Sequence, residues 1–219
     1  EAGLDIPVVV LAYDNLERKE FEARADLSLI ERVYLWQGDG SILVAIVKGV
    51  EDRRNVAHDT VQVGVPVVLV VEDNVRYYSS FLPKMYTELI RQSEKLQGEG
   101  VNLSHKLVRL RARPKILLAT SFEEAEALLE RYTPWLMGLI SDVEFPRGGR
   151  LDREAGFELA RRARARVNDL PILLQSSRAE FAAGAAEVGA TFLRKYSDTL
   201  LADLAKFVNT HCGFGDFVF

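Results

Sequence analysis

Five short apolar runs, separated by segments with helical patterning, constrain the fold of this chain more than any other feature. The runs are VVLVV (67–71), KILLAT (115–120), WLMGLISD (135–142), PILLQS (171–176) and TFLRK (191–195). Short apolar runs between helical segments are typical of strands that are buried on both faces of a parallel sheet. Because the connections between such strands are right-handed crossovers, the pattern predicts an α/β fold with a doubly wound, five-stranded parallel sheet.

Polar residues stand at the ends of four of these runs. Glu72 and Asp73 close the first, Asp142 the third, Ser176 the fourth and Lys195 the fifth. The carboxyl ends of the strands in an open parallel sheet line one crevice, so we expect these side chains to converge there. Three unpaired carboxylates would raise one another's pKa, and a divalent cation relieves that repulsion. Oxygen ligands alone suit magnesium, so the sequence predicts a Mg²⁺ site.

The first 52 residues repeat the second half of this pattern. The segment IPVVVLAYDN (6–15) parallels LPILLQSSRA (170–179), and the segment that begins IERVYLW (30–36) parallels ATFLRKY (190–196). Ala12 stands in the place of Ser176, and Trp36 or Gln37 stands near the place of Lys195, so the repeat lacks the polar chemistry. The repeat predicts a βαβα half-domain. The alternative is that two unrelated βα units happen to align.

The repeat also sets the predicted domain boundaries. We expect a degenerate half-domain at 1–54, a linker at 55–65, the complete domain at 66–211, and the start of a linker or strand to a following domain at 212–219. A two-stranded parallel unit is not stable alone, so the half-domain must pack on the complete domain or on a second copy of the chain. We expect it to pack on the face formed by the fourth and fifth helices of the complete domain.

Composition excludes several classes of partner. The formal net charge of −4 gives no attraction to nucleic acid or to anionic membranes. The longest apolar stretch, VGVPVVLVV (63–71), is too short to span a bilayer. The single cysteine, Cys212, excludes an internal disulfide framework and fits a reducing cytoplasm.

Residues 66–210 resemble the receiver domain of two-component response regulators. This chain carries the elements of that family's site in order. They are the acidic pair Glu72 and Asp73, the phosphoacceptor position Asp142 followed by Pro146, the hydroxyl position Ser176, the aromatic switch position Phe192, and Lys195. The resemblance implies a flavodoxin-like fold with strand order 2-1-3-4-5. It implies a regulatory phosphoacceptor domain of a phosphorelay rather than an enzyme with its own substrate.

The resemblance also implies roles for the site residues. Asp142 is the phosphoacceptor, and Lys195 and Ser176 bind the phosphoryl oxygens. The ligands implied for Mg²⁺ are Glu72, Asp73, Asp142 and the backbone carbonyl of Glu144. Phe192 carries the signal, and Glu144 and Arg178 flank the site. The implied partners are a histidine kinase or phosphotransfer protein as donor, an output domain C-terminal to Phe219 and, in a homodimer, a second copy of the chain.

Several features depart from the receiver pattern. Tyr196 follows Lys195 where the family usually has proline, and the stretch from Gly189 to Lys195 is slightly short. The segment between the first and second strands is long, and GGRLDREA (148–155) is inserted in the charged loop after Asp142. These departures leave one alternative open: a pseudo-receiver that binds partners without phosphorylation. A second alternative is a phosphotransfer module that uses His105, because LSHKL resembles the phosphoacceptor helix of sensor kinases.

Two further alternatives concern single residues and the C-terminal tail. Asp142 alone could cap the following helix, and Phe192 alone could be an ordinary core residue. Through its tail motif GFGDFVF (213–219), the whole chain resembles the N-terminal double-receiver region of multidomain bacterial proteins that continue into a part similar to phosphoenolpyruvate synthase or pyruvate phosphate dikinase.

Overall fold

The main sheet has the predicted order. The computed structural model of the chain describes residues 6–98 and 113–211. Five parallel strands lie in the order β4-β3-β5-β8-β9. The strands are β3 (Val67–Val71), β4 (Lys115–Ala119), β5 (Leu136–Asp142), β8 (Ile172–Ser176) and β9 (Thr191–Arg194). This order is 2-1-3-4-5 along the complete domain, so the doubly wound, flavodoxin-like fold is confirmed.

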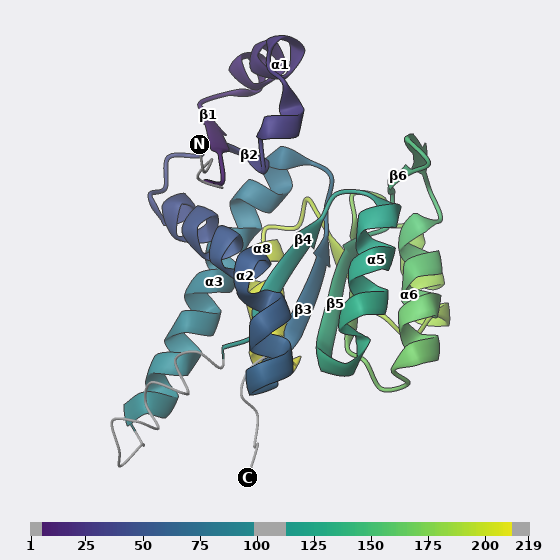
Figure 1. Cartoon of the computed structure of the whole chain (residues 1–219). Helices are drawn as coiled ribbons and strands as arrows, with labels where there is room; N and C mark the ends of the chain where they lie inside the picture. The colour runs from purple at the N-terminus through teal and green to yellow at the C-terminus, as the bar shows by residue number, and fades with distance from the viewer. Residues whose placement is uncertain (1–5, 99–112, 212–219) are drawn as a thin grey trace.

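Helices cover both faces of this sheet, as Figure 1 shows. On one face lie α3 (Val75–Gly98) and α8 (Leu200–His211). On the other lie α5 (Phe122–Tyr132), α6 (Ala155–Arg166) and α7 (Phe181–Glu187), and the short helix η2 (Thr133–Trp135) leads from α5 into β5. Strand β3 is buried throughout and sends alternate side chains to the two cores, which explains why its sequence is uniformly apolar.

The insertion after Asp142 is not an open loop. It forms an antiparallel hairpin of β6 (Phe145–Arg147) and β7 (Arg150–Asp152). The hairpin turns at Gly148 and Gly149, whose φ angles of +60° and +73° suit a two-residue turn that requires positive φ at both positions. The guanidinium of Arg147 lies 4.2 Å from the ring centroid of Phe122, and this contact docks the hairpin on the start of α5.

The N-terminal half-domain has the predicted βαβα elements. They are β1 (Val9–Ala12), α1 (Asn15–Arg24), the short helix η1 (Leu27–Leu29), β2 (Arg32–Leu35) and α2 (Ser41–Val63). Strands β1 and β2 pair in parallel as a separate two-stranded sheet. Residues 55–63 of the segment predicted as a linker belong to α2, so the connection to the main domain is largely helical.

The half-domain packs on a different surface from the one expected. The prediction that it meets the α7–α8 face is wrong, because α2 lies against α3 and the edge strand β4. Ile42 and Ala45 of α2 are buried in the core beneath α3 and α8. An edge strand leaves backbone groups unpaired, and α2 covers the edge that β4 presents.

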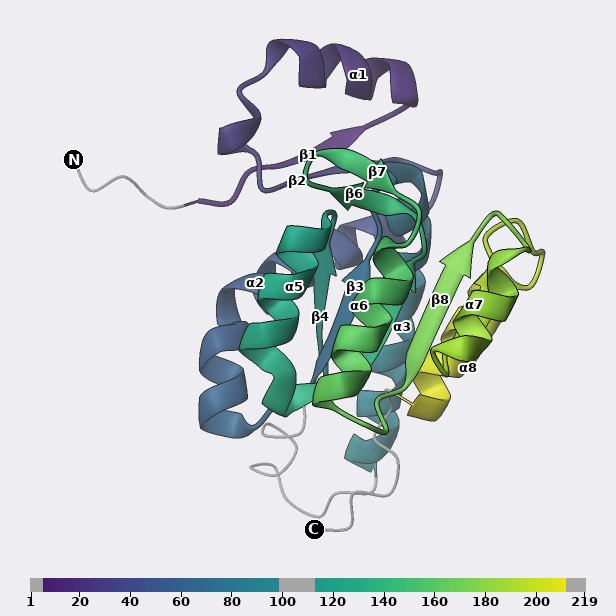
Figure 2. The same ribbon diagram turned by 90° about the vertical axis from the view of Figure 1, so that its right-hand side faces the viewer.

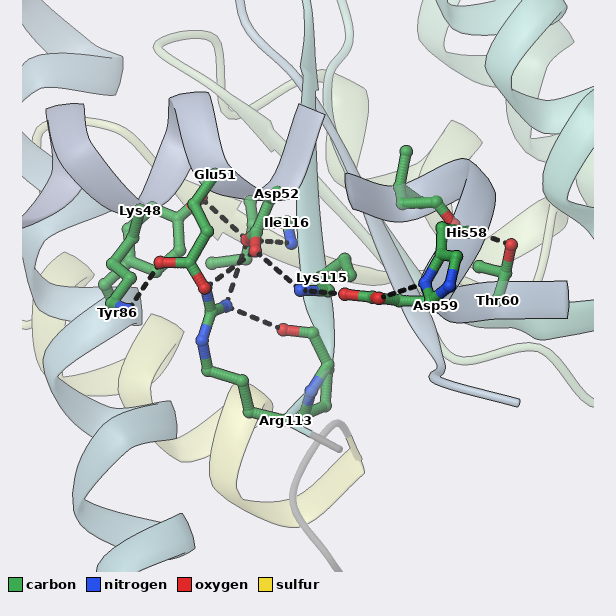
Figure 3. Close-up of polar contacts among 12 residues, drawn as sticks. Lys48, Glu51, Asp52, His58, Asp59, Thr60, Tyr86, Arg113, Lys115 and Ile116 are labelled. Carbon is green, nitrogen blue, oxygen red and sulfur yellow. Dashed lines mark hydrogen bonds and ion pairs between the residues drawn. The ribbon is translucent and has the colours of Figure 1, made fainter. Parts of the chain in front are cut away.

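A buried carboxylate fixes α2 to the main domain, as Figure 3 shows. Asp52 on α2 is 0% exposed. It accepts hydrogen bonds at 2.6 Å from Arg113 Nη2, at 2.9 Å from the backbone N–H of Ile116, and at 3.1 Å from Tyr86 Oη. Because its partners come from α3, from β4 and from the residues just before β4, Asp52 ties three parts of the main domain to α2.

Among the residues that the structure describes, no helix is both long enough and apolar enough to cross a membrane.

Candidate functional site

The polar residues predicted from the strand ends lie together at the carboxyl edge of the main sheet. Glu72 and Asp73 follow β3, Asp142 ends β5, Ser176 ends β8 and Lys195 follows β9. The sheet order places β3 between β4 and β5, so the acidic pair and Asp142 lie on neighbouring strands. The convergence expected from the sequence is therefore present in the fold.

Three carboxylates form the centre of this site. One oxygen from each of Glu72, Asp73 and Asp142 lies within 4.8 Å of the others. Glu72 is 0% exposed and Asp142 is 7% exposed, whereas Asp73 is half-buried and lines an open hollow. Burial raises the pKa of Glu72 to about 8 and also raises the pKa of Asp142 and of Asp73.

Lys195 is the cation that faces these carboxylates. Its Nζ lies 2.7 Å from Glu72 Oε2 and 2.5 Å from Asp142 Oδ2. Burial opposes the charged ammonium, but Glu72 and Asp142 outweigh it and raise the pKa of Lys195. One ammonium cannot balance three carboxylates, so the site has excess negative charge. Its donors are all oxygens in close proximity, and this set fits Mg²⁺.

Asp142 is held at both of its carboxylate oxygens. Oδ1 accepts a hydrogen bond from the backbone N–H of Val143 at 2.7 Å, and Oδ2 contacts Lys195. The backbone here packs closely against the start of α6. A Cβ atom at Gly156 would lie 2.4 Å from the carbonyl oxygen of Asp142, so only glycine fits at that position.

Ser176, Glu144 and Arg178 border the site. Ser176 is 1% exposed, and its Oγ accepts a hydrogen bond from the backbone N–H of Arg178 at 3.2 Å. The guanidinium of Arg178 lies 3.5 Å from Glu144 Oε1, so these two flanking residues pair with each other. Glu144 also lies 3.7 Å from Arg153 in the turn after the hairpin.

Phe192 lies away from the charged cluster. It is half-buried and packs against the core beneath α5, α6 and α7. This location is compatible both with a switch and with an ordinary core residue. His105 lies outside the described residues, as does the tail at 213–219.

Two residues that sequence reasoning missed support the site. Gln175 is 1% exposed, and its Nε2 donates a hydrogen bond to Glu72 Oε2 at 3.1 Å. Tyr77 places its ring centroid 4.4 Å from the ammonium of Lys195 and packs edge-on against the ring of Tyr196. The signal for Gln175 was a polar residue inside an apolar run; no sequence signal pointed to Tyr77.

The site opens into a hollow of about 1050 Å³. The main domain lines most of it, and the N-terminal half-domain contributes a wall that the sequence did not predict. The half-domain residues of that wall are Asn15, Arg18, Lys19 and Gln37.

Comparisons with known proteins give structural likeness to receiver domains. No protein-family model matches the sequence, and no curated relative matches it. A response regulator receiver domain protein from Clostridium thermocellum is 15% identical with a TM-score of 0.42, over 67% of this chain and 93% of that one. The chemotaxis response regulator CheY4 of Vibrio cholerae is 21% identical with a TM-score of 0.40, over 65% and 98%.

A third similar structure is the receiver domain from the hybrid histidine kinase CckA. It is 24% identical with a TM-score of 0.36, over 65% of this chain and 95% of that one. Nothing in these comparisons supports the resemblance of the tail to a phosphoenolpyruvate synthase or dikinase.

Proposed function

We propose that this chain is a phosphoacceptor receiver domain, in which Asp142 takes a phosphoryl group and thereby regulates an attached or partner output domain. One observation carries the proposal: three carboxylates, a buried lysine and a buried serine meet at the ends of four neighbouring strands. Each of them alone could be structural. Together they provide a nucleophile, a cation site and donors to phosphoryl oxygens.

Asp142 is the proposed nucleophile. One of its carboxylate oxygens forms a bond to phosphorus, the bond from phosphorus to the donor's leaving group breaks, and the leaving group keeps the electron pair. The product is an acyl phosphate. The hydrogen bond from the Val143 N–H fixes the rotamer of Asp142 before the reaction, so little reorganisation is required.

Lys195 and Ser176 are the proposed partners of the transferred group. Lys195 already contacts Asp142, so its ammonium needs only a small movement to pair with a phosphoryl oxygen. Asp73 and Asp142, with Glu72 through water and the carbonyl of Glu144, would hold Mg²⁺, which supplies charge neutralisation for the carboxylates and the phosphoryl oxygens. Ser176 would donate a hydrogen bond to another phosphoryl oxygen.

Ser176 and Phe192 would pass the change to the surface. Ser176 moves toward the phosphoryl group and draws with it the loop between β8 and α7. Phe192, half-buried on β9, then turns inward and alters the α7–β9–α8 face, where an output domain or a second copy of the chain would bind.

Glu144 and Arg178 would determine the lifetime of the phosphorylated state. Their side chains pair at 3.5 Å, and Glu144 lines the hollow into which the site opens. In that position they restrict the approach of water to the acyl phosphate. The phosphoryl donor would be a histidine kinase, a phosphotransfer protein or a small phosphorylated molecule, in the cytoplasm.

The proposal is tested by incubating the protein with acetyl phosphate and Mg²⁺ and measuring uptake of one phosphoryl group by intact-protein mass spectrometry. Uptake should require Mg²⁺ and should be lost in Asp142→Asn, whereas the exposed Asp169→Asn should behave as the parent. Magnesium titration should show saturable binding that Asp73→Asn abolishes. Equal uptake by Asp142→Asn and the parent would show that the nucleophile is misassigned.

A further inference from the structure

The N-terminal half-domain lies over the proposed phosphorylation site. Figures 1 and 2 show α1 and the β1–β2 sheet beyond the carboxyl ends of the main strands, the end at which β5 delivers Asp142. Covering hydrophobic surface would not by itself require the half-domain to extend to the carboxyl ends of these strands.

The half-domain is fixed in that position by the first turns of α3. That helix begins two residues after Asp73, so it is directly connected to the acidic pair. Three hydrogen bonds between a side chain and the backbone join α3 to β2 and to the loop after β2. Tyr78 Oη donates to the carbonyl of Val33, and the N–H of Leu35 donates to Ser79 Oγ at 2.9 Å. Gln37 Nε2 donates to the carbonyl of Arg76 at 2.7 Å. The buried contacts of Asp52 on α2 add a second attachment (Figure 3).

The half-domain and the site together line one open hollow of about 1050 Å³. Pockets for small ligands have volumes of roughly 300–1,000 Å³, so this hollow has room for a small molecule and its water. Its charged lining comprises four basic side chains, Arg18, Lys19, Arg76 and Lys195, and four acidic ones, Asp73, Asp142, Glu144 and Asp198. The buried Glu72 adds a fifth carboxylate at the site, so a bound divalent cation leaves one net positive charge around the hollow.

Lys19 is the wall residue best placed to act on an anion. It is exposed, and it forms no ion pair within residues 6–98 and 113–211. Its neighbour Arg18 is already paired with Glu22, at 2.9 Å. Of the two basic residues on this wall, Lys19 therefore has its charge available to a ligand.

We infer that the half-domain forms the donor-binding wall of this site, and that Lys19 attracts the anionic group of a small phosphoryl donor of the acyl phosphate or phosphoramidate type. This inference rests on the function proposed above. With acetyl phosphate, an Asp142 oxygen bonds to phosphorus, the phosphorus–oxygen bond to the acetyl group breaks, and acetate leaves with the electron pair. The half-domain then acts as a donor-binding element and not only as a scaffold.

The test compares charge reversals at two positions of α1. Lys19→Glu changes the wall, whereas Arg24→Glu makes the same charge change in the last turn of the same helix, at a residue that does not line the hollow. Both variants and the parent are incubated with acetyl phosphate or phosphoramidate in Mg²⁺, and the adduct on Asp142 is followed by mass spectrometry. We expect Lys19→Glu to lower the rate about threefold or more at low ionic strength relative to Arg24→Glu, and the difference to shrink as salt is added. Lys19→Arg should retain the parent rate, because it keeps the charge.

The outcomes separate the inference from the function on which it rests. If the parent takes no phosphoryl group from either donor, the proposed function fails and the inference fails with it. If the parent is phosphorylated on Asp142 and Lys19→Glu reacts at the rate of Arg24→Glu at every salt concentration, the function stands and only the inference is overturned. We would then assign the hollow to the binding of a phosphorylated protein that acts as the donor.

Discussion

Replacing the buried carboxylate of Asp52 with an amide tests how firmly the half-domain belongs to the fold. The amide of the Asp52→Asn variant would keep one acceptor oxygen but would turn an N–H₂ donor toward groups that are themselves donors. Arg113 and Lys115 are buried cations, 5% and 3% exposed, and they would lose the negative charge of Asp52 that balances them. Among the carboxylates of the described residues, Arg113 would keep the more distant Glu51, at 3.7 Å, and it would also keep its 3.2 Å hydrogen bond to the carbonyl of Pro114. Lys115 would retain its 2.8 Å pair with Asp59.

The expected cost of Asp52→Asn is large. Breaking a buried ion pair from one side costs about 3–5 kcal/mol. For a chain of this size that loss lowers Tm by roughly 6–20 °C. Because α2 shares the cores on both faces of the sheet, unfolding should remain a single transition in both proteins.

The measurement is urea unfolding followed by circular dichroism, with Asp169→Asn as the matched control. Asp169 is exposed, so the same chemical change there should alter the free energy of unfolding by less than about 0.5 kcal/mol. If Asp52→Asn costs no more than this control, the buried contacts do not hold the half-domain, and the reasoning fails. A separate early transition in the parent would equally contradict it.

Three further changes have defined outcomes. Gly156→Ala would place a methyl group 2.4 Å from the carbonyl oxygen of Asp142, so it should cost about 1–3 kcal/mol in thermal unfolding; an unchanged Tm would contradict the close packing. Burial raises the pKa of Glu72 from 4.5 to about 8, so the folded, metal-free protein holds this proton more tightly than the unfolded chain, and stability should fall as pH rises through that interval. In urea titrations with chelator, Glu72→Gln should flatten that fall, and an unchanged pH slope would refute the assignment. Tyr77→Leu should slow phosphorylation roughly threefold to tenfold, because the ring face beside the Lys195 ammonium is lost, whereas Tyr77→Phe should retain the rate; equal rates for the two variants would exclude this role.

Most of the main sheet was predictable because its inner strands β3, β5 and β8 are largely buried on both faces. An apolar run such as VVLVV is typical of a central strand, and the polar residue after it marks the edge of the sheet at which the site forms. Glu72, Asp73, Asp142 and Lys195 therefore came together as expected. The internal repeat predicted both strands of the N-terminal half-domain.

What the sequence could not predict depends on contacts between distant segments. The expected packing surface of the half-domain was wrong because the burial of Asp52 beside Arg113 leaves no periodic signal in the sequence. The hairpin at Gly148 and Gly149 looked like a charged loop, since its strands are three residues each. The placement of Lys19 beside the site follows from that same unexpected packing.

Chemical identification of the phosphorylated residue tests the central claim most directly. The protein is treated with acetyl phosphate and Mg²⁺, reduced with borohydride, digested and analysed by peptide mass spectrometry, because an acyl phosphate on aspartate is reduced to homoserine. We predict an acid-stable, base-labile adduct and homoserine at position 142. An acid-labile adduct on His105, or no adduct while Mg²⁺ still binds, would contradict it.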